Sequence, residues 1–421
     1  MNTIILKPKK EESLLRFHPW VFSGAIARII LDKNYPYAEP QEGDVVAVYA
    51  ADGKALGVGH WQVGSIAVRI LAFGTDRLGD DFWHERIRAA YTLRRSLGLI
   101  RADNNTYRLI HGEGDFLPGL VIDHYADTAV IQAHSVGMHR ARYQIAEALK
   151  AVTGVENIYY KSDDTLPFKA PIEGDKVGYL SLTQNREPRT QNPEPRTQNP
   201  EPRTEAPVSP WAMENGLEFR IDWLQGQKTG FFVDQRENRM LLERYSAGRD
   251  VLNMFCYTGG FSLYALRGGA KRVTSVDVSQ KAVELVRANM QRNFPTATNH
   301  EEYASDAFEF LKNAEPDTYD LIILDPPAFA KHRDAIKNAL RGYQRLNAQG
   351  IAAVRPGGLV FTFSCSQAVD KEMFRLAVFS AAQQTGRRVR IIHQLHQPQD
   401  HPVNIYHPEG EYLKGLVLQV E

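Results

Sequence analysis

Carboxylates follow three successive predicted strands in the second half of this chain. Asp277, Asp306 and Asp325 stand at the ends of these strands, and a charge beside a buried element is costly unless it has a partner. In an open parallel sheet, ligands bind at the carboxyl ends of the strands, so these three side chains are expected to meet at one ligand-binding edge. Asp277 follows a glycine pair at close to the ~20-residue spacing at which a carboxylate binds the hydroxyl groups of a ribose. The set favours a cofactor that contains a nucleoside.

The glycine pair narrows the choice of cofactor. Gly259 and Gly260 follow the first apolar run and let the backbone approach a ligand closely, although a tight turn into a helix explains a lone glycine pair equally well. The chain has neither a Gly-x-Gly-x-x-Gly pattern nor a Gly-x-x-x-x-Gly-Lys-Ser/Thr loop. Nicotinamide dinucleotides and nucleoside triphosphates need such a cradle for their phosphates. S-adenosylmethionine has no phosphate and is therefore the expected cofactor.

The two cysteines differ in their surroundings. Cys256 and Cys365 form no Cys-x-x-Cys pattern and have no nearby Cys/His partners at metal-ligand spacing, so a disulfide scaffold and a metal site are both disfavoured. Cys365 lies between two serines just after an apolar run, where a thiol can act as a nucleophile. A buried, unreactive cysteine is the ordinary alternative, and it is the preferred interpretation of Cys256, which lies within an apolar run.

The elements that position these residues alternate between strands and helices from about Trp211 onward. The predicted strands are VLNMFC, RVTSVDV, EEYASD, YDLIILD and GLVFTFS, with helices such as GGFSLYALRGG and SQKAVELVRANMQRN between them. This alternation predicts a doubly wound α/β domain over residues 211–421, whose parallel sheet is covered by helices on both faces. The last run, KGLVLQV, is expected to add a final antiparallel strand at the edge of the sheet.

Two further domains and an insertion are expected before this α/β domain. Short alternating runs separated by turn residues predict a small β-barrel over residues 1–76, and mixed strands and helices predict an α+β domain over residues 80–183. Residues 184–210 consist largely of QNPEPRT-type heptads, which contain prolines and no apolar residue and so predict a flexible insertion rather than a coiled coil. In the α+β domain, a helix over residues 81–98 is expected to bury one apolar face, made of Phe82, Ile87, Ala90, Leu93 and Leu97.

The charge balance excludes a global attraction to nucleic acid. The chain has 50 basic and 50 acidic side chains among 421 residues and a formal net charge of zero, so any binding to RNA depends on local patches. The N-terminus has no apolar signal-peptide core, and no run reaches about 18 apolar residues. The sequence therefore predicts a cytoplasmic protein without a membrane partner; it leaves the oligomeric state open, with a homodimer as one candidate. The clearest basic stripe, which a solvated helix face would also explain, consists of Arg86, Arg88, Arg94, Arg95, Arg101 and Arg108.

The motifs resemble those of class I S-adenosylmethionine-dependent methyltransferases. More narrowly, GQKTGFFVDQRENR, NMFCYTGGFS, LDPPAFAK, TFSCS and YHPEGEYLKG resemble the bacterial ribosomal RNA large-subunit methyltransferases that make 5-methylcytosine. The stretches SLLRFHPWVFSGAI and YRLIHGEGDFLPGLVIDHY extend the resemblance over nearly the whole chain outside the heptads, although Phe116 replaces an expected small residue. The resemblance implies an N-terminal PUA domain that binds RNA, an α+β middle domain and a catalytic domain acting on large-subunit (23S) ribosomal RNA.

The resemblance also implies roles for the strand-end residues. Asp277 is expected to bind the ribose of S-adenosylmethionine, and Asp306 with Ala307 is expected to lie beside the adenine. Asp234 and Arg236 are expected to hold the methionine end of the cofactor or the target base; a helix-start role is the alternative for Asp234. The full set of expected cofactor-binding residues is Phe255, Tyr257, Thr258, Gly259, Gly260, Asp277, Asp306, Ala307, Asp234 and Arg236.

The implied reaction requires a nucleophile. Carbon 5 of cytosine is a poor nucleophile until a thiolate adds to carbon 6, and Cys365 is the expected source of that thiolate. Asp325 is expected to hydrogen-bond the base, or else to cap its strand. Pro327 and Ala328 occupy the place of a second cysteine found in other cytosine-5 RNA enzymes, so the sequence does not identify the base that accepts the carbon 5 proton.

The sequence is compatible with two other functions. Asp-Pro-Pro followed by an aromatic residue is also found in enzymes that methylate a base nitrogen, a reaction that needs no covalent adduct and would tolerate the loss of Cys365. A catalytically silent RNA-binding ribosome-assembly factor is the alternative from another class. That factor would not bind the cofactor, and the intact set of Asp277, Asp306, Asp325 and Cys365 argues against it.

Overall fold

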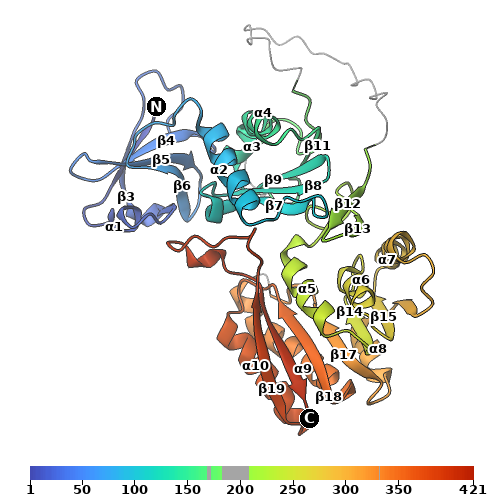
Figure 1. Ribbon diagram of the computed structural model, residues 1–421. Helices are drawn as coiled ribbons and strands as arrows, with labels where there is room; N and C mark the ends of the chain where they lie inside the picture. The colour runs from blue at the N-terminus through green and yellow to red at the C-terminus, as the bar shows by residue number, and fades with distance from the viewer. Residues whose placement is uncertain (168–171, 183–207, 331) are drawn as a thin grey trace. The chain divides into compact units, whose positions relative to one another are not determined.

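A computed structural model describes residues 1–167, 172–182, 208–330 and 332–421. These residues form two compact units (Figure 1). The first unit comprises Met1–Ile100, Tyr107–Trp211 and Asp222–Thr229, and the second comprises Arg101–Thr106, Ala212–Ile221 and Gly230–Glu421. The predicted heptad insertion lies, from residue 184 to 207, outside the described residues.

The first unit begins with a six-stranded, mostly antiparallel sheet in the order β2-β6-β5-β4-β1-β3. Its core consists of alternating strand residues such as Ile4, Val46 and Val68, all shielded from solvent, as the period-2 pattern requires. The predicted β-rich N-terminal domain is therefore confirmed. Its elements are β1 (Thr3–Leu6), α1 (Glu12–Leu15), β2 (Trp20–Phe22), η1 (Ser23–Ala25), β3 (Ile26–Ile30), β4 (Val45–Tyr49), β5 (Ala55–Trp61) and β6 (Ile66–Phe73).

The rest of the first unit is an α+β domain, as predicted. Five strands form a sheet in the order β11-β10-β9-β8-β7, and apolar residues from its strands and helices share one core. The elements are α2 (Phe82–Ser96), β7 (Thr106–His111), η2 (Gly112–Asp115), β8 (Leu120–Tyr125), β9 (Thr128–Ala133), α3 (Val136–Arg140), α4 (Arg142–Thr153), β10 (Asn157–Lys161) and β11 (Val177–Tyr179).

Helix α2 corrects the predicted apolar face at two positions. Leu93 and Leu97 are 38% and 37% exposed, whereas Arg94 is fully buried. The Arg94 guanidinium forms a bidentate ion pair with Asp115, with Nη2 2.8 Å from Oδ2, and its Nε donates to the carbonyl of Arg108. A buried charge is tolerated when it is paired and hydrogen-bonded in this way. Arg94 therefore does not belong to an exposed basic stripe.

The second unit contains a seven-stranded sheet in the order β16-β15-β14-β17-β18-β20-β19. A separate ribbon of two strands, β12 and β13, packs against helix α7. The strands are β12 (Trp211–Glu214), β13 (Leu217–Arg220), β14 (Asp250–Met254), β15 (Arg272–Asp277), β16 (His300–Ala304), β17 (Tyr319–Leu324), β18 (Val354–Ser364), β19 (Val389–His396) and β20 (Lys414–Val420). The helices are η3 (Val233–Gln235), α5 (Arg236–Arg244), α6 (Gly260–Arg267), α7 (Gln280–Asn293), α8 (Ala307–Asn313), η4 (Arg333–Ala335), α9 (Ile336–Ala353), α10 (Lys371–Thr385) and η5 (Pro408–Gly410).

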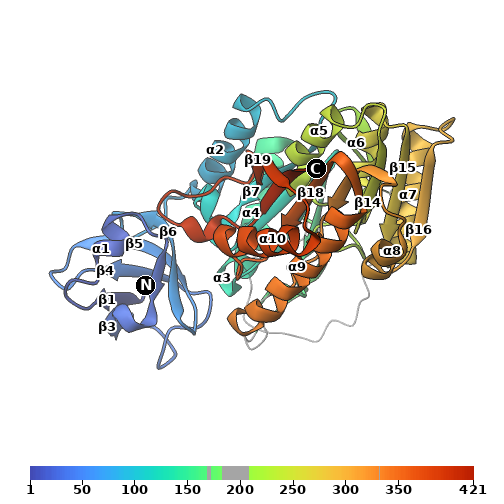
Figure 2. The same ribbon diagram turned by 90° about the horizontal axis from the view of Figure 1, so that it is seen from below.

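Helices cover both faces of this sheet, which confirms the predicted doubly wound α/β class (Figure 2). Successive strand residues point to opposite faces. Leu252 and Ile322 accordingly pack against residues of α9 and α10, and Val251 and Ile323 pack in a second core with residues of α5 and α6. Among the described residues, no helix is long and apolar enough to cross a membrane.

The end of the sheet differs from the prediction in one respect. β20 is antiparallel, as expected, but it lies between β18 and β19 and is not the edge strand. β20 is almost entirely buried, which requires neighbours on both sides, whereas the edge strand β19 is largely exposed. The mixed polar and apolar composition of β19, VRIIHQLH, gave no clear strand signal.

The register of the parallel strands brings their carboxyl ends to one edge. Met254 of β14 is opposite both Val276 of β15 and Leu324 of β17, and Leu324 is opposite Thr362 of β18. The residues at and directly after the ends of these strands therefore lie along that edge in the order of the strands. From β16 to β18 they are Ser305, Asp277 (the last residue of β15), Phe255, Asp325 and Cys365.

Candidate active site

The turn after β14 has an unusual backbone. Phe255, Tyr257 and Gly259 have φ values of 58°, 47° and 80°, so three of five consecutive residues adopt the left-handed region that favours glycine. Non-glycine residues in this region carry strain and cluster at ligand-binding sites. At Gly259 the packing also favours glycine, because a Cβ atom would lie 3.1 Å from the side chain of Val286.

Asp277 connects this turn to the neighbouring strand. Its Oδ2 accepts a hydrogen bond from the backbone N–H of Tyr257 (3.0 Å), and its Oδ1 accepts one from the backbone N–H of Ser279 (2.9 Å). An ionised carboxylate has about four acceptor positions, so two remain for the hydroxyl groups of a ribose. The carboxylate is partly exposed at the edge of the sheet, where a ligand can reach it.

A buried ion pair supports the second glycine of the turn. Arg239 of α5 forms a bidentate pair with Glu214, at 2.9 and 2.7 Å, and donates to the carbonyl of Phe232. Its aliphatic chain lies directly against Gly260, where an added Cβ would be 3.0 Å from the Cδ atom of Arg239. Both positions therefore leave little room for a Cβ atom, and Gly259 in addition has a left-handed backbone conformation.

Asp306 has an observed structural role. Its Oδ1 accepts hydrogen bonds from the backbone N–H groups of Phe308 (2.9 Å) and Glu309 (3.1 Å), so the residue is the N-cap of α8. The adjacent Ala307 is buried. The backbone N–H of Ser305 donates to the carbonyl of Asp277, which keeps this segment next to the expected ribose-binding residue.

Asp325 is oriented by a residue that the sequence analysis did not single out. Gln235 donates from Nε2 to Oδ2 of Asp325 (3.1 Å), and Asn238 donates from Nδ2 to Oε1 of Gln235 (2.6 Å). Gln235 and Asn238 are buried and lie in the resembling stretch GQKTGFFVDQRENR. The resemblance pointed to this stretch as a whole, but no spacing rule identified Gln235 as the partner of Asp325.

Cys365 lies in a turn that is fixed to the segment after Asp325. The hydroxyl of Ser366 donates to the carbonyl of Ala330 (2.5 Å) and accepts from its backbone N–H (3.1 Å), and Ser364 donates to the hydroxyl of Tyr343. The side chain of Cys365 is partly exposed, while Cys256 is buried. Burial raises the pKa of the Cys256 thiol well above its usual range, so Cys365 is the better nucleophile of the two.

Replacement of Ser366 by alanine is expected to lower the free energy of unfolding by about 1–3 kcal/mol, because it leaves buried polar groups of Ala330 without their partner. Urea denaturation measures this change. Ser380 is a matched control, because its hydroxyl bonds only within its own helix, to the carbonyl of Leu376, and Ser380→Ala should change stability by no more than about 0.5 kcal/mol. Equal stabilities of the two variants would contradict the proposed link between the Cys365 turn and the Asp325 segment.

Asp234 and Arg236 anchor a C-terminal loop. Tyr412 donates from its hydroxyl to Oδ2 of Asp234 (2.6 Å), and Arg236 donates from Nη1 to Oδ2 of Asp400 (2.7 Å). Burial alone would raise the pKa of Asp400, but the charges of Arg236 and His401 hold that pKa well below its usual range. The two residues thus have a structural role that the sequence analysis did not include for Arg236.

The strand-end residues fit S-adenosylmethionine. The left-handed turn with Gly259 and Gly260 offers a closely approachable backbone, and Asp277 offers acceptors for ribose hydroxyls. A carboxylate for the ribose and an approachable backbone turn suit a nucleoside that has no phosphates.

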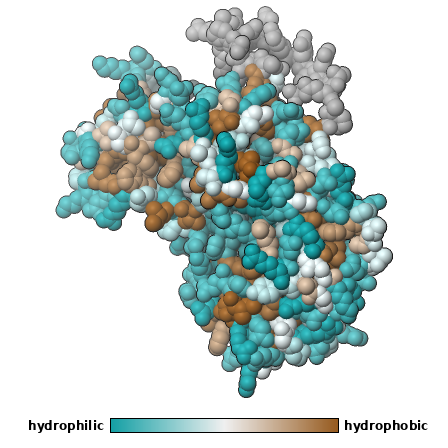
Figure 3. Space-filling model, in the orientation of Figure 1, coloured by the Kyte–Doolittle hydropathy of each residue, from teal (hydrophilic) through white to brown (hydrophobic). Residues whose placement is uncertain are grey.

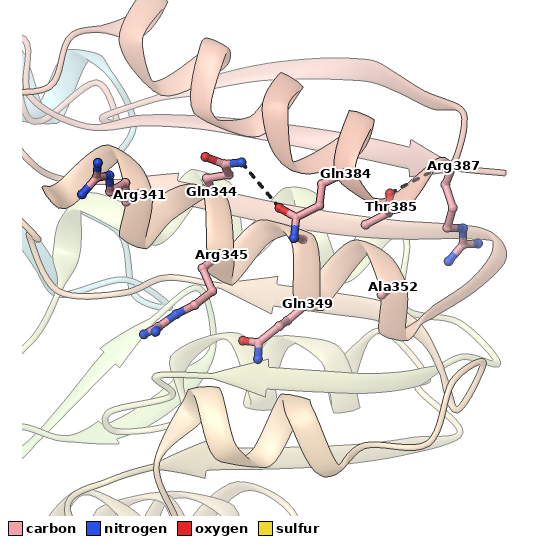
Figure 4. A pocket seen from close by; sticks show the side chains of 9 residues that line it. Arg341, Gln344, Arg345, Gln349, Ala352, Gln384, Thr385 and Arg387 are labelled. Carbon is pink, nitrogen blue, oxygen red and sulfur yellow. Dashed lines mark hydrogen bonds between the residues drawn. The ribbon is translucent and has the colours of Figure 1, made fainter. Parts of the chain in front are cut away.

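An open hollow of about 670 Å³ lies elsewhere in the second unit, against α9 and α10 (Figure 4). Its lining is polar and basic, and none of the expected site residues contributes to it. The lining residues are Arg341, Gln344, Arg345, Ala348, Gln349, Ala352, Gln384, Thr385 and Arg387.

Comparisons with known proteins agree with this geometry. Residues 195–405 match a family model described as S-adenosylmethionine-dependent methyltransferase, and residues 4–73 match a PUA-like domain. The chain is similar over its whole length to a Streptococcus mutans protein described as a SAM-dependent methyltransferase (22% identity, TM-score 0.77, 100% of each chain). It is equally similar to a methyltransferase solved in complex with SAH (23% identity, TM-score 0.78, 100% of each chain), and both likenesses concern the fold.

Two curated relatives are more similar in sequence. The chain is 37% identical to the ribosomal RNA large subunit methyltransferase I of Aeromonas hydrophila and 38% identical to that of Shewanella denitrificans, in each case over 99% of both chains. Identity at this level over the full length shows common family membership. The chain therefore belongs to the ribosomal RNA large subunit methyltransferase I family of S-adenosylmethionine-dependent methyltransferases.

Proposed function

We propose that this protein methylates carbon 5 of a cytosine in large-subunit ribosomal RNA through a covalent bond between Cys365 and carbon 6. The observation that carries the proposal is the pair of hydrogen bonds between Ser366 and Ala330, which fixes the turn of the partly exposed Cys365 to the segment after Asp325. The names of the relatives supply the class of RNA.

Along the edge of the sheet, the residues expected to bind the cofactor and the residues expected to act on the target base follow different strands. The ribose would bind to Asp277, next to the turn of Tyr257, Thr258 and Gly259 after β14. The adenine would lie beside Asp306 and Ala307. S-adenosylmethionine supplies an electrophilic methyl group. Asp325 and Cys365 follow the next two strands, β17 and β18, so the target base would lie on that side of the cofactor.

Cys365 and Asp325 would act on different atoms of the target cytosine. The Cys365 thiolate would form a bond to carbon 6, which shifts the electron pair of the 5,6 double bond to carbon 5. That pair would form the new carbon–carbon bond as the bond between the methyl group and the sulfonium sulfur breaks, leaving SAH. Asp325, oriented by Gln235 at 3.1 Å, would accept a hydrogen bond from the exocyclic amine. A proton shared between its carboxyl group and the ring nitrogen would neutralise the negative charge that the addition places on the ring. Loss of the carbon 5 proton to a base then expels the Cys365 thiolate and restores the double bond.

Methylation of a base nitrogen is the second candidate, favoured by the Asp325-Pro326-Pro327 motif. The aromatic residue near that motif, Phe329, is however packed against Tyr343 with ring centroids 4.7 Å apart. Phe329 thus packs against the core of the domain, and its ring is only partly exposed. The position of Cys365 beside the Asp325 segment favours the carbon 5 reaction.

Mapping of ribosomal RNA by mass spectrometry tests the proposal. Cells that lack this protein should lose 5-methylcytosine at one position of the large-subunit RNA, and the wild-type gene should restore it. Loss of a methyl group from a base nitrogen instead would support the second candidate. An unchanged modification pattern, together with no binding of S-adenosylmethionine to the purified protein, would indicate a catalytically silent RNA-binding protein.

A further inference from the structure

A buried lysine lies directly beneath the turn that carries Cys365. Lys414 opens β20 and is opposite Ser364, the last residue of β18, in the antiparallel ladder. Its side chain is only 6% exposed. The ammonium group donates to the backbone carbonyl of Ser366 at 2.5 Å and to that of Val369. Both carbonyls follow Cys365 in the chain, so the ammonium group of Lys414 is fixed to the backbone that begins at the residue directly after the thiol.

The charge of Lys414 has no salt-bridge partner among the described residues. An ammonium group has three N–H donors, and the two carbonyls account for two of them. Burial lowers the pKa of Lys414 to about 8, while the nearby Cys365 acts to raise it. A cation near a thiol favours the thiolate form, and the ammonium group of Lys414 is held at the residue directly after Cys365.

The other charges around Lys414 do not replace this interaction. Asp370 also favours the charged lysine, but one of its oxygens caps α10 through the backbone N–H of Met373. Lys371 and Glu411 oppose each other and form their own ion pair at 2.6 Å. Tyr343, whose hydroxyl accepts a hydrogen bond from Ser364, is buried, and burial raises its pKa, so it remains neutral near pH 7.

We propose that Lys414 is a positioning residue for Cys365, which holds the turn through the carbonyls of Ser366 and Val369 and stabilises the thiolate with its ammonium charge. The inference rests on the proposed function of Cys365 as a nucleophile. Below about pH 8 the ammonium is charged, which covers the pH at which the thiolate is needed. A lysine that only filled space here would be replaceable by methionine, whereas this one supplies a charge that methionine lacks.

Alkylation of a single thiol tests this role without RNA or cofactor. The chain has two cysteines, so Cys256→Ala leaves Cys365 as the only thiol. The rate of alkylation by iodoacetamide is measured against pH in this background, with Lys414, Lys414→Met and Lys414→Arg. Loss of the charge in Lys414→Met should raise the pH of half-maximal rate by at least about one unit, which is about tenfold less thiolate at pH 7. Lys414→Arg should keep the profile close to that of the lysine protein, because it keeps the charge.

An unchanged profile in a folded Lys414→Met variant would overturn the proposal. Should that variant not fold, Lys414→Gln gives the same comparison, since glutamine can still donate to the carbonyls but has no charge. The lysine protein alone provides a further check, because a half-maximal rate at or above the ordinary thiol pKa of about 8.5 would also contradict it. If Cys365→Ala retained methylation while the alkylation profile still depended on Lys414, the proposed function would fail and the pairing of the two side chains would stand.

Discussion

Replacement of Cys365 by alanine is expected to reduce methyl transfer to RNA by at least about 10³-fold, as removal of a nucleophile does in other enzymes. Without the thiolate, carbon 5 of the cytosine has no electron pair to offer, and the remaining residues can only bind the two substrates. Transfer of a labelled methyl group from S-adenosylmethionine to large-subunit RNA measures the effect. The variant should still bind SAH, because Cys365 follows β18, whereas the expected ribose-binding residue Asp277 ends β15, and two strands separate β15 from β18 in the sheet.

Cys256 provides the matched control for this experiment. It is buried after β14 with a raised pKa, so Cys256→Ala should keep methyl transfer while removing the same sulfur atom. Retention of activity in Cys365→Ala would contradict the covalent mechanism and would favour methylation of a base nitrogen. Loss of SAH binding in Cys365→Ala would instead indicate damage to the whole site.

Asp277→Asn is expected to weaken the binding of SAH by roughly 10- to 150-fold, the equivalent of about 1.5–3 kcal/mol for hydrogen bonds to a charged acceptor. Asparagine keeps one oxygen but replaces the other with a donor. It thereby loses an acceptor for a ribose hydroxyl and a contact with the backbone N–H of Tyr257 or Ser279. Isothermal titration calorimetry measures the affinity, and urea denaturation shows how much of the change reflects stability.

Glu301→Gln is the control for this second prediction. Glu301 is an exposed carboxylate on the neighbouring strand β16, and its contact is with the hydroxyl of Tyr303. The same chemical change at this position should leave the affinity for SAH unaltered. Equal affinities of Asp277→Asn and the unaltered protein would rule out Asp277 as the ribose-binding residue.

The sequence predicted the sheet well because its central strands are continuous apolar runs. The residues after those runs, Asp277, Asp325 and Cys365, therefore lie at the expected edge. The edge strand β19 was missed because exposure to solvent allows a mixed composition. For the same reason the order of β19 and β20 could not be read from the chain, although the antiparallel direction of β20 could.

Long-range polar contacts were beyond the reach of sequence patterns. Arg94 occupies the inner face of α2 because Asp115, far along the chain, supplies a carboxylate for it, and helical spacing alone assigned that face to Leu93 and Leu97. Gln235 and Lys414 were likewise found only through their partners in space. Surface hydropathy does not mark these contacts either, because apolar patches are scattered among polar residues on the face in Figure 3.

One local departure from the family pattern does have a visible consequence. Phe116 stands where a small residue was expected, and its backbone adopts a φ of 59°. The left-handed region is disfavoured for a side chain of this size. The expectation of a small residue there thus matches a backbone requirement, which the phenylalanine of this chain satisfies under strain.

Trapping on RNA that contains 5-fluorocytosine shows directly whether Cys365 forms a covalent bond to carbon 6. Fluorine at carbon 5 cannot leave as a proton does, so the bond between the enzyme and carbon 6 should persist after methyl transfer. Wild-type protein and Cys256→Ala should both form a denaturation-resistant adduct with large-subunit RNA in the presence of S-adenosylmethionine. Mass spectrometry should place that adduct on Cys365, and Cys365→Ala should form none. Methylation of the unmodified RNA without any adduct on the fluorinated RNA, or an adduct on another residue, would contradict the covalent role of Cys365.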